Sequence, residues 1–360
     1  MAFEATKREW SEVYLLLRLL SDGYVGMGRS DMEKGDLCRM PIAVIRREEH
    51  DGTRFYKVEE GTIHVKGENI DKRFSREEIG CAAARILQAL HEGDSNEITS
   101  PDGIEEFLND VSIYDLEART EDRTDLHIAF YGEEAPFVGF CFRSRVGGVL
   151  SLLEGRAANF KFEQTGIRFA VPTVNKINAT GEPGNVTERM LMIERLGGVL
   201  KYSDVADKVF RNNLSMIDLH AGRLWGEMIR TMWLEGITKI SDLTESIKVK
   251  NPLKINDDLI HKQGFYEYKV KETLLALATG MRPLKTYTGR DNAISGLLFV
   301  TGDGKVTGYG NAFRKQFADF LFYHTRLEKG SVEKYKYGYL ERENGKYYFK
   351  LNLKISLLKR

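Results

Sequence analysis

Two side chains of opposite charge stand out in residues 123–144, because their spacing could place them together at one end of a hairpin. Residues 126–130 and 140–143 alternate apolar and polar side chains with the period of two typical of β-strands. A hairpin folded symmetrically about Glu134 would place Asp125 opposite Arg143, with a cysteine diagonal to it. This arrangement suits metal-dependent phosphodiester hydrolysis, and it is equally that of an ordinary cross-strand ion pair.

A helix expected upstream of this hairpin offers a further carboxylate. Thr6 and Glu9 have the spacing of a capping box, which predicts a helix through Leu20 with Gly23 as its stop. Its apolar side chains recur on one face: Trp10, Val13, Tyr14, Leu17 and Leu20. Because Glu9 is occupied by capping, Glu12, one turn further on, is the better candidate for a second acidic group.

The remaining pattern is mixed, with strands and helices in separate blocks. Short strands are expected within 37–65 and a capped helix at 76–91. Residues 187–282 are predicted to be mostly helical, and strand signals return from residue 296 onward. We therefore expect an α/β fold of the α+β kind, in which helices flank a mixed sheet, followed by a mostly helical middle region and a β-rich C-terminal segment.

Length and composition favour two domains. The chain has 360 residues, 42% of them hydrophobic, and can bury a large core. The stretch 178–186 is rich in Gly, Asn and Pro and is the best linker candidate. We expect a first domain over 1–177, holding the site described above, and a second over 187–360.

Net charge indicates no particular partner, since Lys plus Arg and Asp plus Glu number 53 each. The distribution is uneven, however, because residues 326–360 hold ten basic and four acidic side chains. Such a segment fits a phosphate-binding face, and it fits equally a Lys-rich sheet edge that deters aggregation.

The cysteines and the hydropathy pattern bear on location. Cys38, Cys81 and Cys141 are odd in number and lack C-x-x-C spacing, which predicts a reduced, cytoplasmic protein without structural zinc. No run of 18 apolar residues occurs, and the N-terminus lacks an apolar signal-peptide region. We expect no membrane association.

Several short motifs together resemble the HpaII-type restriction endonucleases. Gly139-Phe-Cys-Phe-Arg-Ser144, with Leu152-Leu-Glu154 and Asn159-Phe160 after it, is similar to the family's Gly-Phe-Ser-Ile-Lys-Ser, Leu-Leu-Asn and Asn-Phe block. Residues 7–14 resemble the family's Lys-Gly-Glu-Trp-Ser-Glu-Leu-Tyr. Further landmarks follow in the right order, so that the resemblance covers nearly the whole chain: 213–218, 251–253, 280–283 and 350–355.

The resemblance implies a type II restriction endonuclease with a PD-(D/E)XK-like fold, that is, a restriction-endonuclease-like mixed sheet core. It implies Mg²⁺ as cofactor and double-stranded DNA as substrate, cut at a short palindrome with CCGG as the family's type site. Asp125 matches the metal-binding aspartate, and Glu12 could bring a further acidic ligand. Residues 1–177 would be the nuclease core with the metal site, and 187–360 would make DNA contacts. A palindrome presents two equivalent phosphates, so a homodimer on DNA is expected.

Two residues among the implied catalytic ones, Arg143 and Cys141, depart from the family pattern. Arg143 replaces the family Lys; it can hold a phosphate, but it cannot act as a base because its pKa stays above about 12. Cys141 replaces the family Ser, and a thiol is a poor ligand for Mg²⁺. Lys161, on a neighbouring strand, could lend an ammonium group or face solvent. The alternatives are a DNA-binding protein with a degenerate, inactive nuclease site and, more remotely, a partner-binding protein with the hairpin as scaffold.

Contacts with DNA need cations on phosphates and hydrogen-bonding side chains on base edges. The polar loop 286–292 is a candidate for reading bases, and residues 334–337 alternate cations with tyrosines, as in a phosphate-binding segment or a twisted edge strand. The residues expected to contact DNA are Arg145, Arg156, Asn159, Arg290, Lys334 and Lys336.

Overall fold

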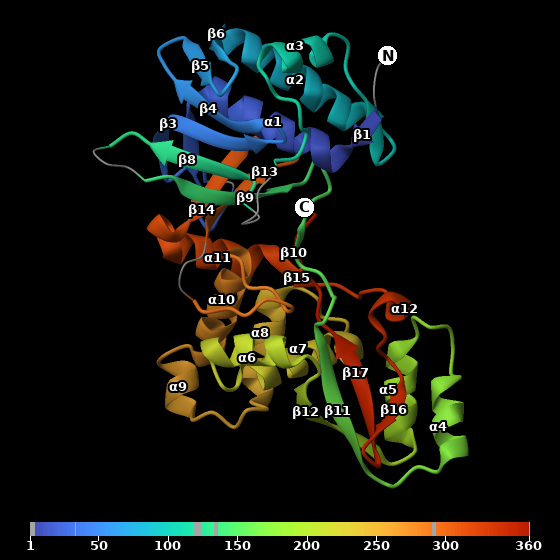
Figure 1. The fold of residues 1–360 in the computed structure, drawn as a ribbon. Helices are drawn as coiled ribbons and strands as arrows, with labels where there is room; N and C mark the ends of the chain where they lie inside the picture. Colours follow the sequence, from blue (N-terminus) through green and yellow to red (C-terminus); the bar gives the residue numbers. More distant parts are fainter. Residues whose placement is uncertain (1–3, 33, 119–123, 133–135, 290–292, 360) are drawn as a thin grey trace. The chain divides into compact units, whose positions relative to one another are not determined.

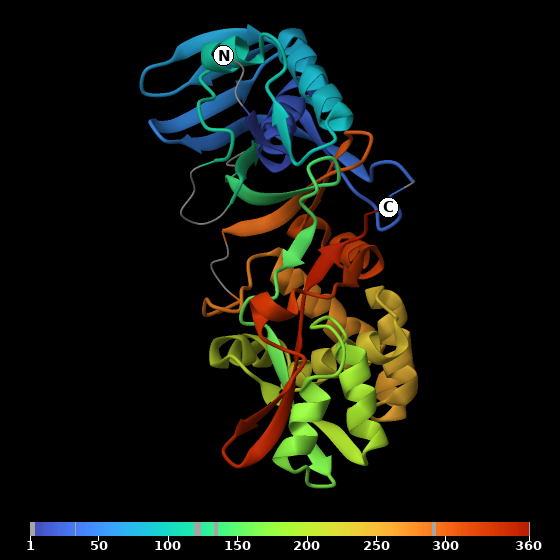
Figure 2. The same cartoon turned by 90° about the vertical axis from the view of Figure 1, so that its right-hand side faces the viewer.

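The chain forms two compact units in the computed structural model, which describes residues 4–32, 34–118, 124–132, 136–289 and 293–359 (Figures 1 and 2). Unit 1 comprises residues 1–150 and 292–320 with Lys359, and unit 2 comprises 151–291 and 321–358 with Arg360. The units are not the consecutive segments 1–177 and 187–360, because 292–320 returns to the first unit, where its strands are orange among blue and green ones in Figure 1. The supposed linker 178–186 joins two helices inside unit 2.

Unit 1 is built on a nine-stranded mixed sheet, as expected. β9 runs parallel to β13, and β2 runs parallel to β14, while the other neighbours are antiparallel. The long strand β3 also pairs with β2 through its first residues. The order across the sheet is β2 (Tyr24–Met27), β14 (Val306–Gly310), β13 (Ile294–Val300), β9 (Val138–Ser144), β8 (Leu126–Phe130), β3 (Cys38–Glu49), β4 (Gly52–Val58), β5 (Thr62–Lys66) and β6 (Asp71–Ser75).

Helix α1 (Lys7–Asp22) organises the core of unit 1. Thr6 and Glu9 form the predicted capping box, and Gly23 ends the helix in the left-handed conformation. The helix packs against β2, β9 and β14 and against α2 (Arg76–Glu92), whose own capping box was also predicted. Buried from several sides, α1 carries two polar side chains, Ser11 and Glu12, into the core as well. The remaining elements here are β1 (Glu4–Thr6), β7 (Glu97–Thr99), α3 (Ile104–Asp110), η1 (Asn311–Phe313) and the first part of α11 (Arg314–His324).

Unit 2 combines two antiparallel sheets with helices. The larger sheet has the order β12 (Gly198–Val205), β11 (Asn159–Gly166), β17 (Lys346–Asn352) and β16 (Leu340–Glu343). The smaller has the order β10 (Ser151–Leu153), β18 (Ile355–Leu357) and β15 (Thr325–Leu327). The helices of this unit are α4 (Val171–Asn178), α5 (Val186–Arg195), α6 (Lys208–Ile217), α7 (Ala221–Glu235), α8 (Ile240–Lys250), α9 (Asp257–His261), α10 (Phe265–Ala278) and α12 (Val332–Tyr335).

The middle region is mostly helical, as expected, with α5 to α10 between residues 186 and 278. It also contains the strand β12, which was not predicted and whose first residues alternate between buried and exposed. Lys334 lies in the short helix α12 and Lys336 caps it in the left-handed conformation, so of the two alternatives for this stretch the edge strand is excluded.

Candidate active site

The hairpin β8–β9 forms, but its register differs from the symmetric one. Leu126 pairs with Phe140 and Ile128 with Val138, whereas folding about Glu134 would place Leu126 opposite Phe142. Pro136 has no backbone N–H for the ladder, and β9 begins only at Val138. The prediction that Asp125 directly faces Arg143 is therefore wrong by two positions.

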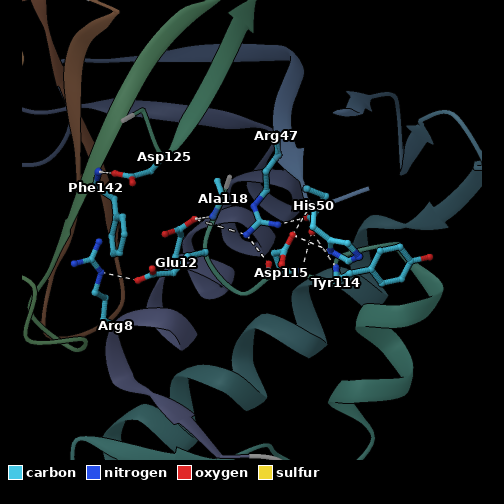
Figure 3. Close-up of polar contacts among 11 residues, drawn as sticks. Arg8, Glu12, Arg47, His50, Tyr114, Asp115, Ala118, Asp125 and Phe142 are labelled. Atoms are coloured by element: carbon cyan, nitrogen blue, oxygen red, sulfur yellow. Dashed lines mark hydrogen bonds and ion pairs between the residues drawn. The ribbon is translucent and has the colours of Figure 1, made fainter. Parts of the chain in front are cut away.

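Asp125 and Arg143 nevertheless both bind the backbone of one residue, Phe142. The Phe142 N–H donates to Asp125 Oδ2 at 2.7 Å (Figure 3). Arg143 Nη1 donates to the Phe142 carbonyl at 2.5 Å. The Asp125 N–H donates to the Phe140 carbonyl at 2.9 Å. Burial raises the pKa of Asp125, and the Phe142 N–H and the Arg143 charge oppose that rise. The structure thus brings this carboxylate and this cation together through the backbone of β9.

Glu12, the candidate preferred over Glu9, lies near enough to Asp125 for the charge of Asp125 to raise its pKa. Its side chain is buried, and Oε1 accepts a hydrogen bond of 2.6 Å from the Ala118 N–H (Figure 3). Burial raises the pKa of Glu12, the charge of Asp125 adds to the rise, and Arg47 and the Ala118 N–H oppose it, so that the pKa lies at about 8. The charge of Asp125 thus makes ionisation of Glu12 less favourable, as expected of neighbouring carboxylates.

Arg47 on β3 is a buried cation that sequence reasoning missed. Only 1% of it is exposed, and it forms an ion pair with Glu49 and lies 3.6 Å from Glu12 Oε1 through Nη2. Its Nη2 also donates to the Asp115 carbonyl at 2.7 Å. The signal in the sequence was the strand period, which puts Arg47 on the same face as the fully buried Ile45. The charged run around it resembled a solvated hairpin end instead.

This network fixes the segment that precedes Asp125. Glu49 Oε2 accepts hydrogen bonds from the backbone N–H groups of Tyr114 at 3.1 Å and Asp115 at 2.7 Å. The Glu12 bond to Ala118 holds the other end of the same segment. Three buried charged side chains therefore hold a single irregular stretch of backbone against the sheet (Figure 3).

A second ion pair lies at the edge of the site. Arg8 Nε lies 2.7 Å from Glu117 Oε1, and both side chains are about half exposed. Arg8 lowers the pKa of Asp125, and Glu117 raises it. Neither residue was predicted to take part, and both come from elements that also hold Glu12 and Ala118.

Cys141 is buried, and its thiol binds within the sheet. It is 3% exposed, and its thiol donates to the Gly296 carbonyl on β13 at 3.7 Å. Among the described residues, no group of three or more His, Cys, Asp or Glu side chains could hold a metal ion. The oxygens of Glu12 and Asp125 are of the type that Mg²⁺ prefers, and a bound cation would offset the effect of the Asp125 charge on Glu12.

The predicted DNA-contacting residues are distributed over both units. In unit 1, the Arg145 guanidinium lies 5.2 Å from the centre of the Phe299 ring, and burial lowers its pKa. In unit 2, Arg156, Lys334 and Lys336 are exposed. Asn159 instead takes part in internal hydrogen bonds with Tyr335 and Asn352, and Arg290 lies outside the described residues.

Lys161 does not lie on a strand next to the hairpin. It belongs to β11 in unit 2, where it forms an ion pair with Glu343. The suggestion that its ammonium group assists Asp125 has no support from the topology.

Comparison with known proteins shows the family to which the chain belongs. A family model described as HpaII restriction endonuclease matches residues 6–357. The chain belongs to the HpaII restriction endonuclease family. It is 29% identical to the type II restriction enzyme HpaII of Haemophilus parainfluenzae, over 99% of both chains. No solved structure matches.

Family membership identifies the chain as a restriction endonuclease, a site-specific hydrolase of double-stranded DNA. The resemblance inferred from short motifs is thereby confirmed, and it extends over both units. In the described part of the chain, no helix is long and apolar enough to cross a membrane.

Proposed function

We propose that this restriction endonuclease hydrolyses the phosphodiester bonds of a short palindrome, with CCGG as the site to test first, and uses Mg²⁺ held by Asp125 and Glu12. The observation that carries the proposal is the position of Asp125, which shares Phe142 as a hydrogen-bond partner with Arg143 and lies near enough to Glu12 to raise its pKa. The relative HpaII is named as a type II restriction enzyme, which fits cleavage at a defined sequence.

The two carboxylates suit the metal because Mg²⁺ commonly binds one or two carboxylates and keeps several waters. When bound, it would lower the pKa of a water and neutralise charge on the phosphate. Ionised Asp125 is held in place by the Phe142 N–H, and ionised Glu12 by the Ala118 N–H and by Arg47. Each ligand thus has a fixed orientation before DNA arrives.

Arg143 would act on the phosphate as a fixed cation. Its guanidinium stays protonated at all ordinary pH values, so it cannot accept a proton from the attacking water. It can donate hydrogen bonds to phosphate oxygens, on which negative charge builds as water attacks and the 3′ oxygen leaves. Cys141, whose thiol faces Gly296, would have no role in this reaction.

The decisive experiment incubates the protein with plasmid DNA that contains CCGG sites, with and without Mg²⁺. Discrete fragments that appear only with the metal support the proposal, and sequencing of their ends identifies the site. Specific binding without cutting would favour the inactive DNA-binding alternative. No affinity for DNA would refute both.

The metal site is tested with Asp125→Ala, which we expect to abolish cutting while DNA binding persists. Isothermal titration with Mg²⁺ should also show loss of binding in this variant. Glu106→Ala, an exposed carboxylate on α3, serves as control. Full activity of Asp125→Ala would remove the proposed site. Gel filtration with a CCGG duplex tests for the expected homodimer.

A further inference from the structure

Unit 2 contains a recess of about 370 Å³ that the proposed catalytic chemistry does not use. It lies between the connection from β11 to α4 and the turn of the β16–β17 hairpin. Its lining includes Gln164 and three cations, Arg168, Arg342 and Lys346. The recess therefore gathers positive charge from two elements that are distant in sequence.

The residues that line the recess include no carboxylate, and the carboxylates on the strands beside it are paired with lysines. Glu163 pairs with Lys346 at 2.9 Å. Glu343 pairs with both Lys161 and Lys350, and Glu341 also pairs with Lys350.

Two arginines remain beside these pairs. Arg168 and Arg342 are exposed and have no ion pair among the residues that the structure describes. Because the three carboxylates are matched by three lysines, the positive charges of Arg168 and Arg342 are available to an external anion.

The framework that carries these arginines is fixed. Asn178 at the end of α4 donates to the Leu340 carbonyl at 2.9 Å and accepts from the Leu340 N–H at 2.8 Å. This bidentate contact sets α4 against β16, so that Arg342, two residues further on, keeps its place beside the recess. Val171, the first residue of α4, also lines it, and the helix has no side-chain cap at Ala170. Its first turn adds a weak positive potential.

We propose that this recess binds a phosphate group of the DNA backbone through Arg168 and Arg342. The proposal rests on the proposed function, which supplies DNA as the ligand. A guanidinium group can donate two parallel hydrogen bonds to phosphate oxygens. Contacts of this kind position a protein on DNA without reading its sequence. The recess would thus contribute affinity and orientation, while catalysis remains with unit 1.

The test is DNA binding as a function of salt, with Arg168→Gln, Arg342→Gln and the double variant. Fluorescence anisotropy of a labelled duplex in EDTA avoids cleavage. We expect the double variant to bind about tenfold more weakly. The slope of log affinity against log salt should fall by about 0.9, the loss of one phosphate contact. Arg223→Gln, an exposed arginine on α7 outside the recess, should match the wild type.

A second measurement uses inorganic phosphate as the probe. At matched ionic strength, phosphate should raise the melting temperature of the wild type more than that of the double variant. Wild-type affinity and salt slope in the double variant would overturn the recess proposal and leave the proposed function intact. A wild-type protein that binds no DNA would refute the proposed function itself. Equal phosphate shifts in both proteins would also count against the recess.

Discussion

The ion pairs beside the site in unit 1 and those on the larger sheet of unit 2 differ in burial. In unit 1, Glu12, Arg47 and Glu49 are 2%, 1% and 5% exposed, and they form one network with the backbone of residues 114–118. In unit 2, Lys161 and Lys350 keep about a fifth of their side-chain surface exposed, and their carboxylate partners keep more. The buried Arg189 of unit 2 donates instead to the backbone carbonyls of Glu182 and Pro183.

This difference in burial indicates different roles for the two sets of ion pairs. A buried ion pair suffers a desolvation penalty that its own attraction often fails to offset, so it is seldom retained for stability alone. Surface pairs contribute little and are replaced easily. The network of Glu12, Arg47 and Glu49 is therefore best understood as a device that orients Glu12 and the chain leading to Asp125.

The largest effect should follow from Arg47→Met. It would leave Glu12 and Glu49 buried without their cation, and we expect the free energy of unfolding to fall by about 3–5 kcal/mol. Urea denaturation followed by circular dichroism measures this. Arg46→Met is the matched control, because Arg46 pairs with the partly exposed Glu48 and should lose under about 1 kcal/mol. An equal fall in the free energy of unfolding in the two variants would show that the burial of Arg47 does not increase its contribution to stability.

The burial of Arg47 could not be predicted from the sequence. The capping boxes at Thr6 and Ser75 were predicted correctly because each depends on residues within a single turn. Burial of Arg47 depends on Tyr114 and Asp115, more than sixty residues away. A charged run at a hairpin end is normally solvated, so nothing local to Arg47 reveals the covering segment.

The sheet shows the same limit. Strands β8 and β9 were predicted from their period, but their register depends on how the intervening connection closes. The parallel pairing of β13 with β9 joins segments some 150 residues apart, and it explains why residues 292–320 complete unit 1. Glu12 could be selected from sequence because capping excluded Glu9, and the charge of Asp125 raises its pKa as a near neighbour would.

Arg143→Gln should have the next largest effect, and on activity rather than stability. Loss of the fixed cation is expected to lower kcat about 10²- to 10³-fold, as for removal of one transition-state donor. Arg143→Lys should retain activity, because it keeps the charge and matches the family residue. Single-turnover cleavage with Mg²⁺ measures both. If Arg143→Gln cuts as fast as the wild type, electrostatic catalysis by this residue is excluded.

Glu12 gives a smaller effect that depends on pH. Its pKa in the folded state is raised from 4.5 to about 8, so the folded state binds a proton more tightly than the unfolded one. The corresponding stabilisation is fully present below about pH 4.5 and is lost as the pH rises through about 8. In EDTA, Glu12→Gln should remove most of the fall in the free energy of unfolding that the wild type shows between about pH 4.5 and 8. Glu106→Gln controls for the loss of one carboxylate, and an unchanged slope in Glu12→Gln would contradict the assignment.

The smallest effect should come from Glu343→Gln in unit 2. The variant breaks the pairs with Lys161 and Lys350, yet all three side chains keep contact with water, so the free energy of unfolding should fall by less than about 1 kcal/mol. The unpaired lysines would add positive charge near the recess, so DNA affinity at low salt should rise slightly. A loss above 2 kcal/mol, roughly twice the usual surface limit, would mean that these pairs behave like the buried network of unit 1. The ion pairs of unit 2 would then contribute as much to stability as those of unit 1, despite their greater exposure.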